Sequence, residues 1–118
     1  MTITASPAWV AIDAHRDAIS KTHLRDLFAA DPKRVESLTL SFDGMFYDFS
    51  KQRVTSETMD LLVSLAKEAL VPEWTERMFA GERINISEGR SVLHTALRRS
   101  AGPFPGKDFD VMPEVIET

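Results

Sequence analysis

The sequence predicts an α+β fold that is mostly helical, with about five helices and one β-hairpin at roughly residues 36–50. Three observations support this fold class. Apolar residues recur at spacings of three or four along most of the chain, which is typical of helices. Residues 38–49 alternate around an Asp-Gly pair instead, which is typical of a hairpin. Ser, Thr, Pro and Gly stand at the places where helices would begin or end.

The first helix is expected to begin at Ser6, whose hydroxyl can accept hydrogen bonds from free backbone amides. Pro7 would occupy the first helical position, where a missing N–H costs nothing. Trp9, Ile12 and Ile19 follow at helical spacings and are expected to share one buried stripe.

A short second helix is expected after Thr22, which would cap it. Asp31-Pro32 would end it, because the residue before a proline is pushed out of the helical region. Its apolar residues are Leu24, Leu27 and Phe28.

The clearest local signal is the hairpin. Asp43-Gly44 suits a two-residue turn that needs positive φ at both positions. This turn predicts the pairs Phe42–Met45, Leu40–Tyr47 and Leu38–Phe49, all on one side of the hairpin. An isolated hairpin is marginal in water, so this apolar face is expected to pack on helices or on another sheet.

Two further helices are predicted after the hairpin. Thr55 would cap a third helix, with an inner stripe of Met59, Leu62, Leu65 or Ala66, and Ala69. Pro72 would open a fourth helix, and Gly81 would end it. Trp74, Met78 and Phe79 would lie on one side of that helix.

A fifth helix is expected from a cap at Asn85 or Ser87 through about Arg98. The Gly- and Pro-rich residues from Ser100 to Asp110 are expected to form a loop. Met112-Pro113 then predicts the start of another helix, which the chain is too short to complete. We therefore expect a segment cut from a longer protein at Thr118.

Composition excludes several classes of function. The formal net charge of −4 and the pI of about 5.3 argue against binding nucleic acid, which calls for a basic face. Without cysteine, disulfides, thiolate nucleophiles and zinc–thiolate sites are ruled out. No signal peptide and no apolar run long enough to span a bilayer is present, so we expect no membrane partner and a cytoplasmic location.

No catalytic, substrate-binding or metal-ligating residue is predicted. The three histidines, His15, His23 and His94, lack a second ligand at helical metal spacing. His94 is expected within the fifth helix as a packed, hydrogen-bonded residue. His15-Arg16-Asp17 matches part of a kinase catalytic loop, but the asparagine and the glycine-rich loop that should accompany it are missing.

Two weaker candidates remain. The segment Ser87-Glu88-Gly89-Arg90 could bind a phosphate at the start of the fifth helix, although a structural cap is favoured there. Trp9, Trp74, Phe79 and the hairpin aromatics could form a base-stacking surface, although the acidic balance favours core packing.

Five ordered stretches resemble the N-terminal region of the glucose-6-phosphate isomerase family, and the resemblance extends over nearly the whole chain. They are residues 19–28 (ISKTHLRDLF), 48–55 (DFSKQRVT), 78–85 (MFAGERIN), 88–98 (EGRSVLHTALR) and 111–115 (VMPEV). The family more often has Tyr at the position of Phe49 and Lys at the position of Arg83. The segment between Arg98 and Val111 also diverges from the family pattern.

The resemblance implies a parent enzyme that interconverts glucose 6-phosphate and fructose 6-phosphate through an enediol, with a glutamate base and no metal or cofactor. It further implies a cytoplasmic homodimer with two α/β/α sandwich domains. The family's catalytic and substrate-binding residues lie beyond the matched segment, so none is transferred to this chain. Residues 1–118 would be an N-terminal helical and hairpin segment, truncated before the sandwich domains and inactive alone. The alternative is a free-standing, non-catalytic binding or regulatory module.

Overall fold

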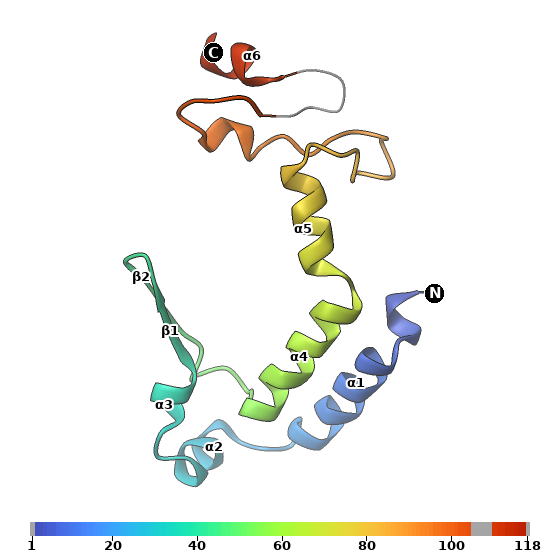
Figure 1. Cartoon of the computed structure of the whole chain (residues 1–118). Coiled ribbons are helices and arrows are strands. Elements are labelled where there is room, and N and C mark those ends of the chain that lie inside the picture. The colour runs from blue at the N-terminus through green and yellow to red at the C-terminus, as the bar shows by residue number, and fades with distance from the viewer. Residues whose placement is uncertain (1, 105–109, 118) are drawn as a thin grey trace. The chain divides into compact units, whose positions relative to one another are not determined.

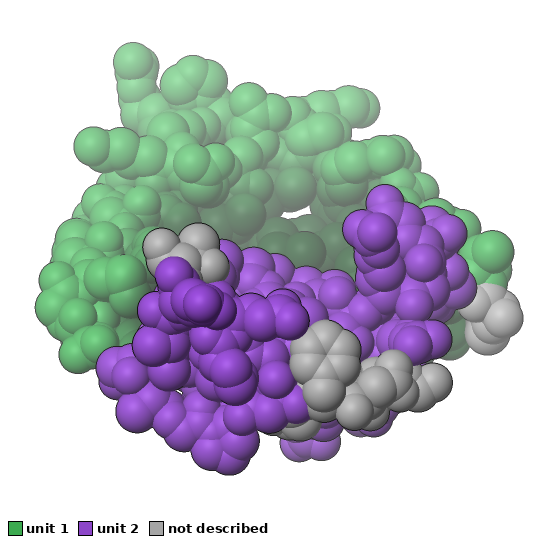
Figure 2. Space-filling view, turned by 90° about the horizontal axis from the view of Figure 1, so that it is seen from above, with its two compact units in different colours: residues 1–69 green, residues 70–118 purple. Residues whose placement is uncertain are grey.

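The computed structural model describes residues 2–104 and 110–117, and Figure 1 shows its elements. The chain divides into two compact units, Met1–Ala69 and Leu70–Thr118, which Figure 2 colours separately. Unit 1 contains η1 (Ile3–Ala5), α1 (Pro7–Ile19), α2 (Leu24–Ala30), α3 (Arg34–Ser37), β1 (Thr39–Phe42), β2 (Met45–Asp48) and α4 (Ser56–Glu68). Unit 2 contains α5 (Val71–Phe79), η2 (Ala96–Arg98) and α6 (Met112–Glu117). The predicted α+β class is confirmed.

The first helix begins as predicted. The Ser6 hydroxyl accepts a hydrogen bond from the backbone N–H of Trp9 at 3.2 Å, and Pro7 stands at the first position of α1. The predicted stripe is wrong at Trp9, which is exposed. The half-buried face runs through Ile12, His15 and Ile19 instead. It packs against α4, and the two helices lie side by side (Figure 1).

The second helix starts one residue later than predicted. Its N-cap is His23 rather than Thr22, and the His23 ring nitrogen Nδ1 accepts from the N–H of Arg25 at 3.1 Å. The helix ends before Asp31-Pro32, as predicted. The short helix α3, which the sequence analysis missed, follows directly and carries the chain into β1.

The hairpin confirms the predicted turn and register. Asp43 and Gly44 have φ of 46° and 76°, and the pairs Leu40–Tyr47 and Phe42–Met45 form as expected. The N–H of Phe49 donates to the carbonyl of Leu38 at 3.0 Å, which closes the base of the hairpin.

The apolar face of the hairpin is covered only at its base. Leu38 is 3% exposed and Phe49 is half-buried. The four outer residues, which we call the outer hairpin face, are 48–72% exposed: Leu40, Phe42, Met45 and Tyr47. The expectation that helices or a second sheet cover this face is therefore not met by the described residues of unit 1.

Helix α4 begins at the predicted cap. The Thr55 hydroxyl accepts from the N–H of Thr58 at 3.3 Å, while the Thr58 hydroxyl accepts from the N–H of Thr55 at 2.9 Å. This reciprocal capping box satisfies two amides that the helix itself leaves unpaired. The inner stripe differs from the prediction at one position, because Leu61 is half-buried and Leu62 is 42% exposed.

In unit 2, α5 begins at Val71, one residue before the predicted start at Pro72. The preceding residue, Leu70, has a φ of 57°. Gly81 ends the helix as predicted: its φ is 72°, and the N–H of Glu82 reaches back to the carbonyl of Arg77 at 3.0 Å. A left-handed glycine with this bond is a common helix stop.

The predicted fifth helix, from Asn85 or Ser87 to Arg98, is wrong. Asn85 and Arg90 instead exchange backbone hydrogen bonds of 3.1 and 3.2 Å across a turn, in which Gly89 has a φ of 63°. Helical structure returns only in the single 3₁₀ turn η2.

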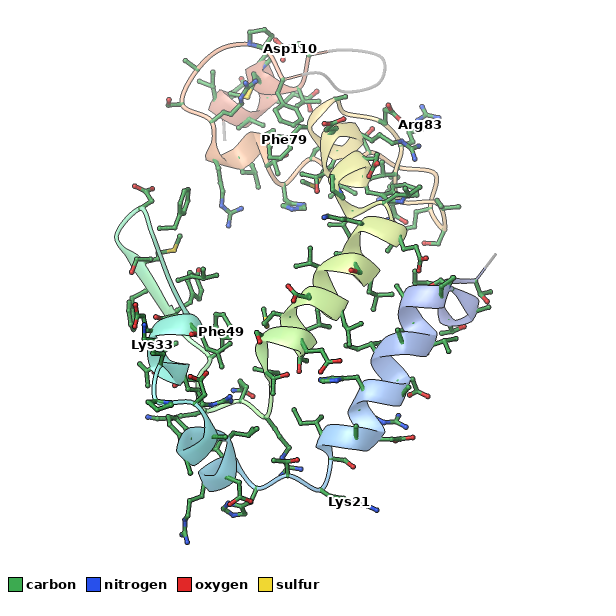
Figure 3. The ribbon with its side chains drawn as sticks, turned by 60° about the horizontal axis from the view of Figure 1, so that its bottom comes forward. Lys21, Lys33, Phe49, Phe79, Arg83 and Asp110 are labelled. Atoms are coloured by element: carbon green, nitrogen blue, oxygen red, sulfur yellow. The ribbon has the colours of Figure 1, made fainter. Side chains whose placement is uncertain are left out.

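The core of unit 2 includes residues on both sides of the predicted loop. Ala96, Phe104, Val111 and Met112 form a buried cluster. The Asp110 carboxylate accepts hydrogen bonds from the N–H groups of Phe104 and Met112, at 2.8 and 3.0 Å, at the start of α6 (Figure 3). The predicted last helix is thus confirmed, whereas part of the predicted loop, residues 105–109, lies outside the described residues.

Candidate functional site

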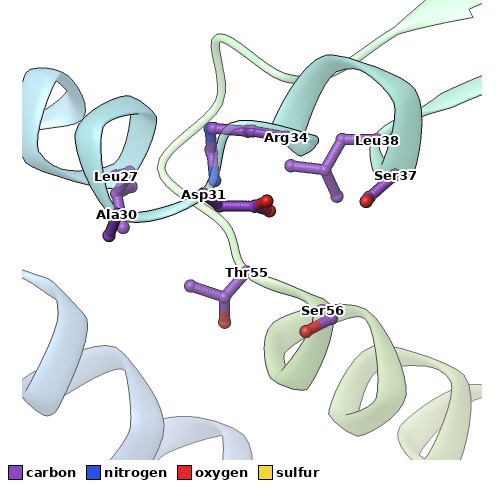
Figure 4. Close-up of a pocket in the computed structure, with 8 residues that line it drawn as sticks. All are labelled: Leu27, Ala30, Asp31, Arg34, Ser37, Leu38, Thr55 and Ser56. Carbon is purple, nitrogen blue, oxygen red and sulfur yellow. The ribbon is translucent and has the colours of Figure 1, made fainter.

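Unit 1 contains a pocket of about 260 Å³ among the described residues. It lies among α2, α3 and the start of α4 (Figure 4). Its lining consists of Leu27, Ala30, Asp31, Arg34, Ser37, Leu38, Thr55 and Ser56.

Arg34 is the dominant charge of this pocket, and it is only 2% exposed. Its Nε donates to the carbonyl of Ser50 at 2.8 Å, and its Nη2 donates to the carbonyl of Gln52 at 2.7 Å. The guanidinium carbon also lies 5.4 Å from the centroid of the Phe28 ring, within cation–π range. Arg34 therefore fastens α3 to the segment between the hairpin and α4. Sequence analysis did not single it out, because no local pattern marks a buried arginine.

Two further polar groups of the pocket take part in local structure. An Asp31 carboxylate oxygen accepts from the N–H of Lys33 at 3.0 Å, and Thr55 takes part in the capping box of α4. General acid–base or nucleophilic catalysis requires a base within hydrogen-bond reach of a reacting group. Asp31 is the lining residue that could act as such a base, but its carboxylate is held by the turn at Lys33, and we assign the pocket a structural role.

The histidines lie in three separate surroundings. His15 faces α4 and bonds the Thr58 hydroxyl at 2.7 Å. His23 caps α2 through its ring nitrogen. His94 is exposed in a turn before η2, so the prediction of a packed histidine inside a helix is wrong.

The anion site considered at Ser87–Arg90 does not form in the way envisaged, because no helix begins there. The Asn85 side-chain oxygen accepts from the Ser87 hydroxyl at 2.9 Å, and the Glu88 carboxylate lies 3.9 Å from the Arg90 guanidinium. The carboxylate of Glu88 therefore already faces the guanidinium of Arg90, so this turn does not favour a bound phosphate.

The aromatic residues also do not form the core as predicted. Trp9 and Phe79 are exposed, the latter by 54%, and only Trp74 is half-buried. The guanidinium carbon of Arg77 lies 4.3 Å from the centroid of the Trp74 ring, and Arg77 also bonds Glu82 at 2.7 Å. Trp74 is therefore occupied by an arginine of its own helix.

The described residues contain neither a cluster of side chains that could hold a metal ion nor a helix that could span a membrane. Within residues 2–104 and 110–117, no three His, Asp or Glu side chains gather closely enough to hold a metal ion. No helix of these residues has the length and apolar character that crossing a bilayer requires.

Comparison with known proteins gives one consistent family. The sequence model described as phosphoglucose isomerase matches residues 48–118. A glucose-6-phosphate isomerase from Deinococcus deserti is 55% identical over 116 residues, which is 98% of this chain. Proteins of the same name from Pseudomonas putida and Frankia casuarinae are 50% and 48% identical over 114 residues, 96% of this chain.

These relatives are much longer than the chain. It spans 21% of the Deinococcus and Pseudomonas proteins and 20% of the Frankia protein. The likeness therefore covers almost all of this sequence but a small part of each relative.

Proposed function

This chain belongs to the phosphoglucose isomerase family, and we propose that the whole protein carrying it interconverts glucose 6-phosphate and fructose 6-phosphate. The observation that carries the proposal is 55% identity over 98% of the chain to a protein named glucose-6-phosphate isomerase. The resemblance noted in the five sequence stretches points to the same activity. No feature of the described residues favours a free-standing regulatory module.

In the proposed reaction the sugar ring opens, and a glutamate moves a proton between the first two carbons through an enediol. The substrate, the homodimeric assembly, the two α/β/α domains and the cytoplasmic location all belong to this proposal for the whole protein. No metal or cofactor is needed, because a carboxylate base of suitable pKa can move such a proton. We place the base and the phosphate-holding groups outside residues 1–118.

We propose a scaffolding role for the chain itself. Its best-connected polar groups, Arg34 and the Thr55–Thr58 capping box, bond backbone groups and fix local structure. Its outer hairpin face presents four large side chains to solvent. Exposed apolar surface of this kind normally meets another protein surface. The remainder of the polypeptide is the partner we propose for this face.

A comparison of the 118-residue chain with the full-length protein tests these proposals. Both are assayed with fructose 6-phosphate, and the glucose 6-phosphate formed is oxidised by a coupling dehydrogenase that reduces NADP⁺. We expect turnover by the full-length protein and none above a buffer blank by the chain. No turnover by the full-length protein would refute the family activity. Turnover by the chain alone would refute the scaffolding role.

A variant pair separates scaffolding from chemistry within the full-length protein. Phe42→Ser, on the outer hairpin face, should lower the thermal midpoint while the kcat of the remaining folded enzyme stays unchanged. Leu97→Ser, at a residue of unit 2 that is 68% exposed, is the control for an exposed apolar residue outside the hairpin. A lower kcat of Phe42→Ser, measured at a temperature where the variant is fully folded, would place the hairpin in the catalytic machinery, contrary to the proposal.

A further inference from the structure

His15 sits at the junction of α1 and α4, and its side chain is 10% exposed. Its Nε2 atom lies 2.7 Å from the Thr58 hydroxyl oxygen, in the first turn of α4. Its Nδ1 atom lies 3.7 Å from a carboxylate oxygen of Glu57. The imidazole thus contacts two neighbouring residues of α4 through its two nitrogens.

The two contacts set the neutral tautomer of the ring. An ionised carboxylate can only accept hydrogen bonds, whereas a hydroxyl can both donate and accept. A bare Nδ1 lone pair would face the negative oxygen of Glu57, so Nδ1 is the nitrogen that carries hydrogen. Nε2 then accepts from the hydroxyl of Thr58.

We propose that His15 fastens α1 to α4 through hydroxyl hydrogen bonds that reverse direction when the ring gains a proton, so that the joint persists in both charge states. The Thr58 hydroxyl lies 2.7 Å from His15 and 3.1 Å from the Thr55 hydroxyl, so it can donate to either. This second contact is what allows the reversal.

The Thr58 hydroxyl has hydrogen-bond partners in both charge states of the His15 ring. With a neutral ring, the Thr58 hydroxyl donates to Nε2 and accepts from the N–H and the hydroxyl of Thr55. With a charged ring, Nε2–H donates to Thr58, which turns its own hydrogen to the Thr55 oxygen. Thr58 still accepts the N–H of Thr55, and the charged ring also gains attraction to Glu57.

Several other charged groups of the two packed helices have partners of their own, and one of them, Glu68 of α4, accepts a hydrogen bond from the N–H of Ala8 at 2.8 Å. On α1, Arg16 bonds Asp13 and Asp17 at 2.9 Å each, on an exposed side of the helix. On α4, Glu57 faces the ring. The protonation of His15 therefore acts mainly on the Glu57 and Thr58 contacts.

The tautomer is measured by long-range ¹H–¹⁵N spectroscopy on the chain labelled at histidine, with the three rings assigned by His→Gln variants. At pH 8 we expect Nδ1–H for His15. In Thr58→Val, which removes the hydroxyl but keeps the branched shape, the Nε2–H form should become populated, whereas Thr58→Ser should retain Nδ1–H. A wild-type ring in the Nε2–H form would overturn the proposal, as would a tautomer unchanged in Thr58→Val.

The contact between α1 and α4 through His15 is measured in both charge states by hydrogen exchange of α1 amides. After correction for the intrinsic pH dependence, protection should agree within about twofold between two pH values at which the ring ¹⁵N shifts show His15 to be neutral and charged. Thr58→Val should reduce α1 protection at least tenfold, because it removes the bond to His15 and also the bonds of the Thr58 hydroxyl to Thr55. A tenfold change in wild-type α1 protection between the two pH values would refute the reversal. A His94→Gln control should show wild-type protection at both.

Discussion

Gly44→Val gives a direct test of the hairpin turn. Gly44 has a φ of 76°, and a Cβ built there meets nothing within 4 Å. The cost of valine is therefore backbone strain rather than a clash. A left-handed conformation costs a residue with a Cβ about 1–2 kcal/mol, and β-branching adds resistance. Since about 1.4 kcal/mol is a factor of ten, the open hairpin should become about 5- to 30-fold more populated.

The amide of Phe49 reports on this opening, because it donates to the carbonyl of Leu38 at the base of the hairpin. Its hydrogen exchange should accelerate by the same factor in Gly44→Val. Gly44→Asn should cost less, since asparagine tolerates positive φ. Gly102→Val is the matched control, with a φ of 84° and equally open space in unit 2. Exchange at Phe49 equal to wild type in Gly44→Val would refute the turn and with it the register.

Three further predictions concern polar groups of unit 1. Thr55→Ala removes the N-cap of α4 and should cost about 1 kcal/mol in urea unfolding; Thr55→Ser should restore most of it, and equal midpoints for all three proteins would contradict the cap. Arg34→Ala removes the donor of the Ser50 carbonyl and one of the two donors of the Gln52 carbonyl, which keeps the N–H of Val54, and it should cost about 2 kcal/mol, with partial recovery in Arg34→Lys; a fully stable Arg34→Lys would show that the planar fork is unnecessary. Hydrogen bonding from Ser50, whose N–H donates to an Asp48 carboxylate oxygen at 2.8 Å, holds the pKa of Asp48 below its usual value. The stabilising effect of this hydrogen bonding is present above the ordinary carboxyl pKa and lost as pH falls through the lowered one, so Asp48→Asn should be destabilised at pH 7 and match wild type at strongly acid pH. A stability gap that persists in acid would contradict this assignment.

Local chemistry explains which parts of the fold could be predicted. Ser6, Thr55 and Gly81 act on backbone groups within a few residues, so their roles as caps and stop follow from sequence spacing alone. The Asp43-Gly44 turn fixes the hairpin register for the same reason. Among the helix starts of unit 1, α2 departs from this rule, because the ring nitrogen of His23, in place of Thr22, accepts the amide hydrogen.

The failed helix at residues 85–98 shows where local signals compete. Asn85 and Glu88 match a capping box, but the same asparagine also closes a turn through its side-chain oxygen, which accepts from Ser87. Gly89 adopts positive φ at little cost and lets Arg90 pair with Asn85. Spacing could not separate these outcomes, because both use the same residues at the same separation.

Burial was the least predictable property, and its failures share a cause. Three apolar residues that follow helical spacing are exposed: Trp9, Leu62 and Phe79. In contrast, the charged residue Arg34 is only 2% exposed. Helical periodicity identifies the apolar face of a helix, but it does not identify the surface against which that face packs. The absence of predicted site residues likewise remains a prediction, since it depends on where the catalytic groups of the whole protein lie.

The distribution of buried apolar residues helps to explain why the chain forms its helices and hairpin although much of their apolar surface is exposed. Fully buried apolar side chains number few in the described residues of each unit: Leu27 and Leu38 in unit 1, and Ala96, Phe104, Val111 and Met112 in unit 2. The helices and hairpin are instead defined by caps, a turn and side chains that bond backbone groups. Such elements can form their shapes before their apolar faces meet a partner, because capping and turn formation need no distant contact. A segment spanning 21% of the length of its relatives can thus specify its own elements, and under the proposed scaffolding role the rest of the whole protein covers the apolar faces that stay exposed here.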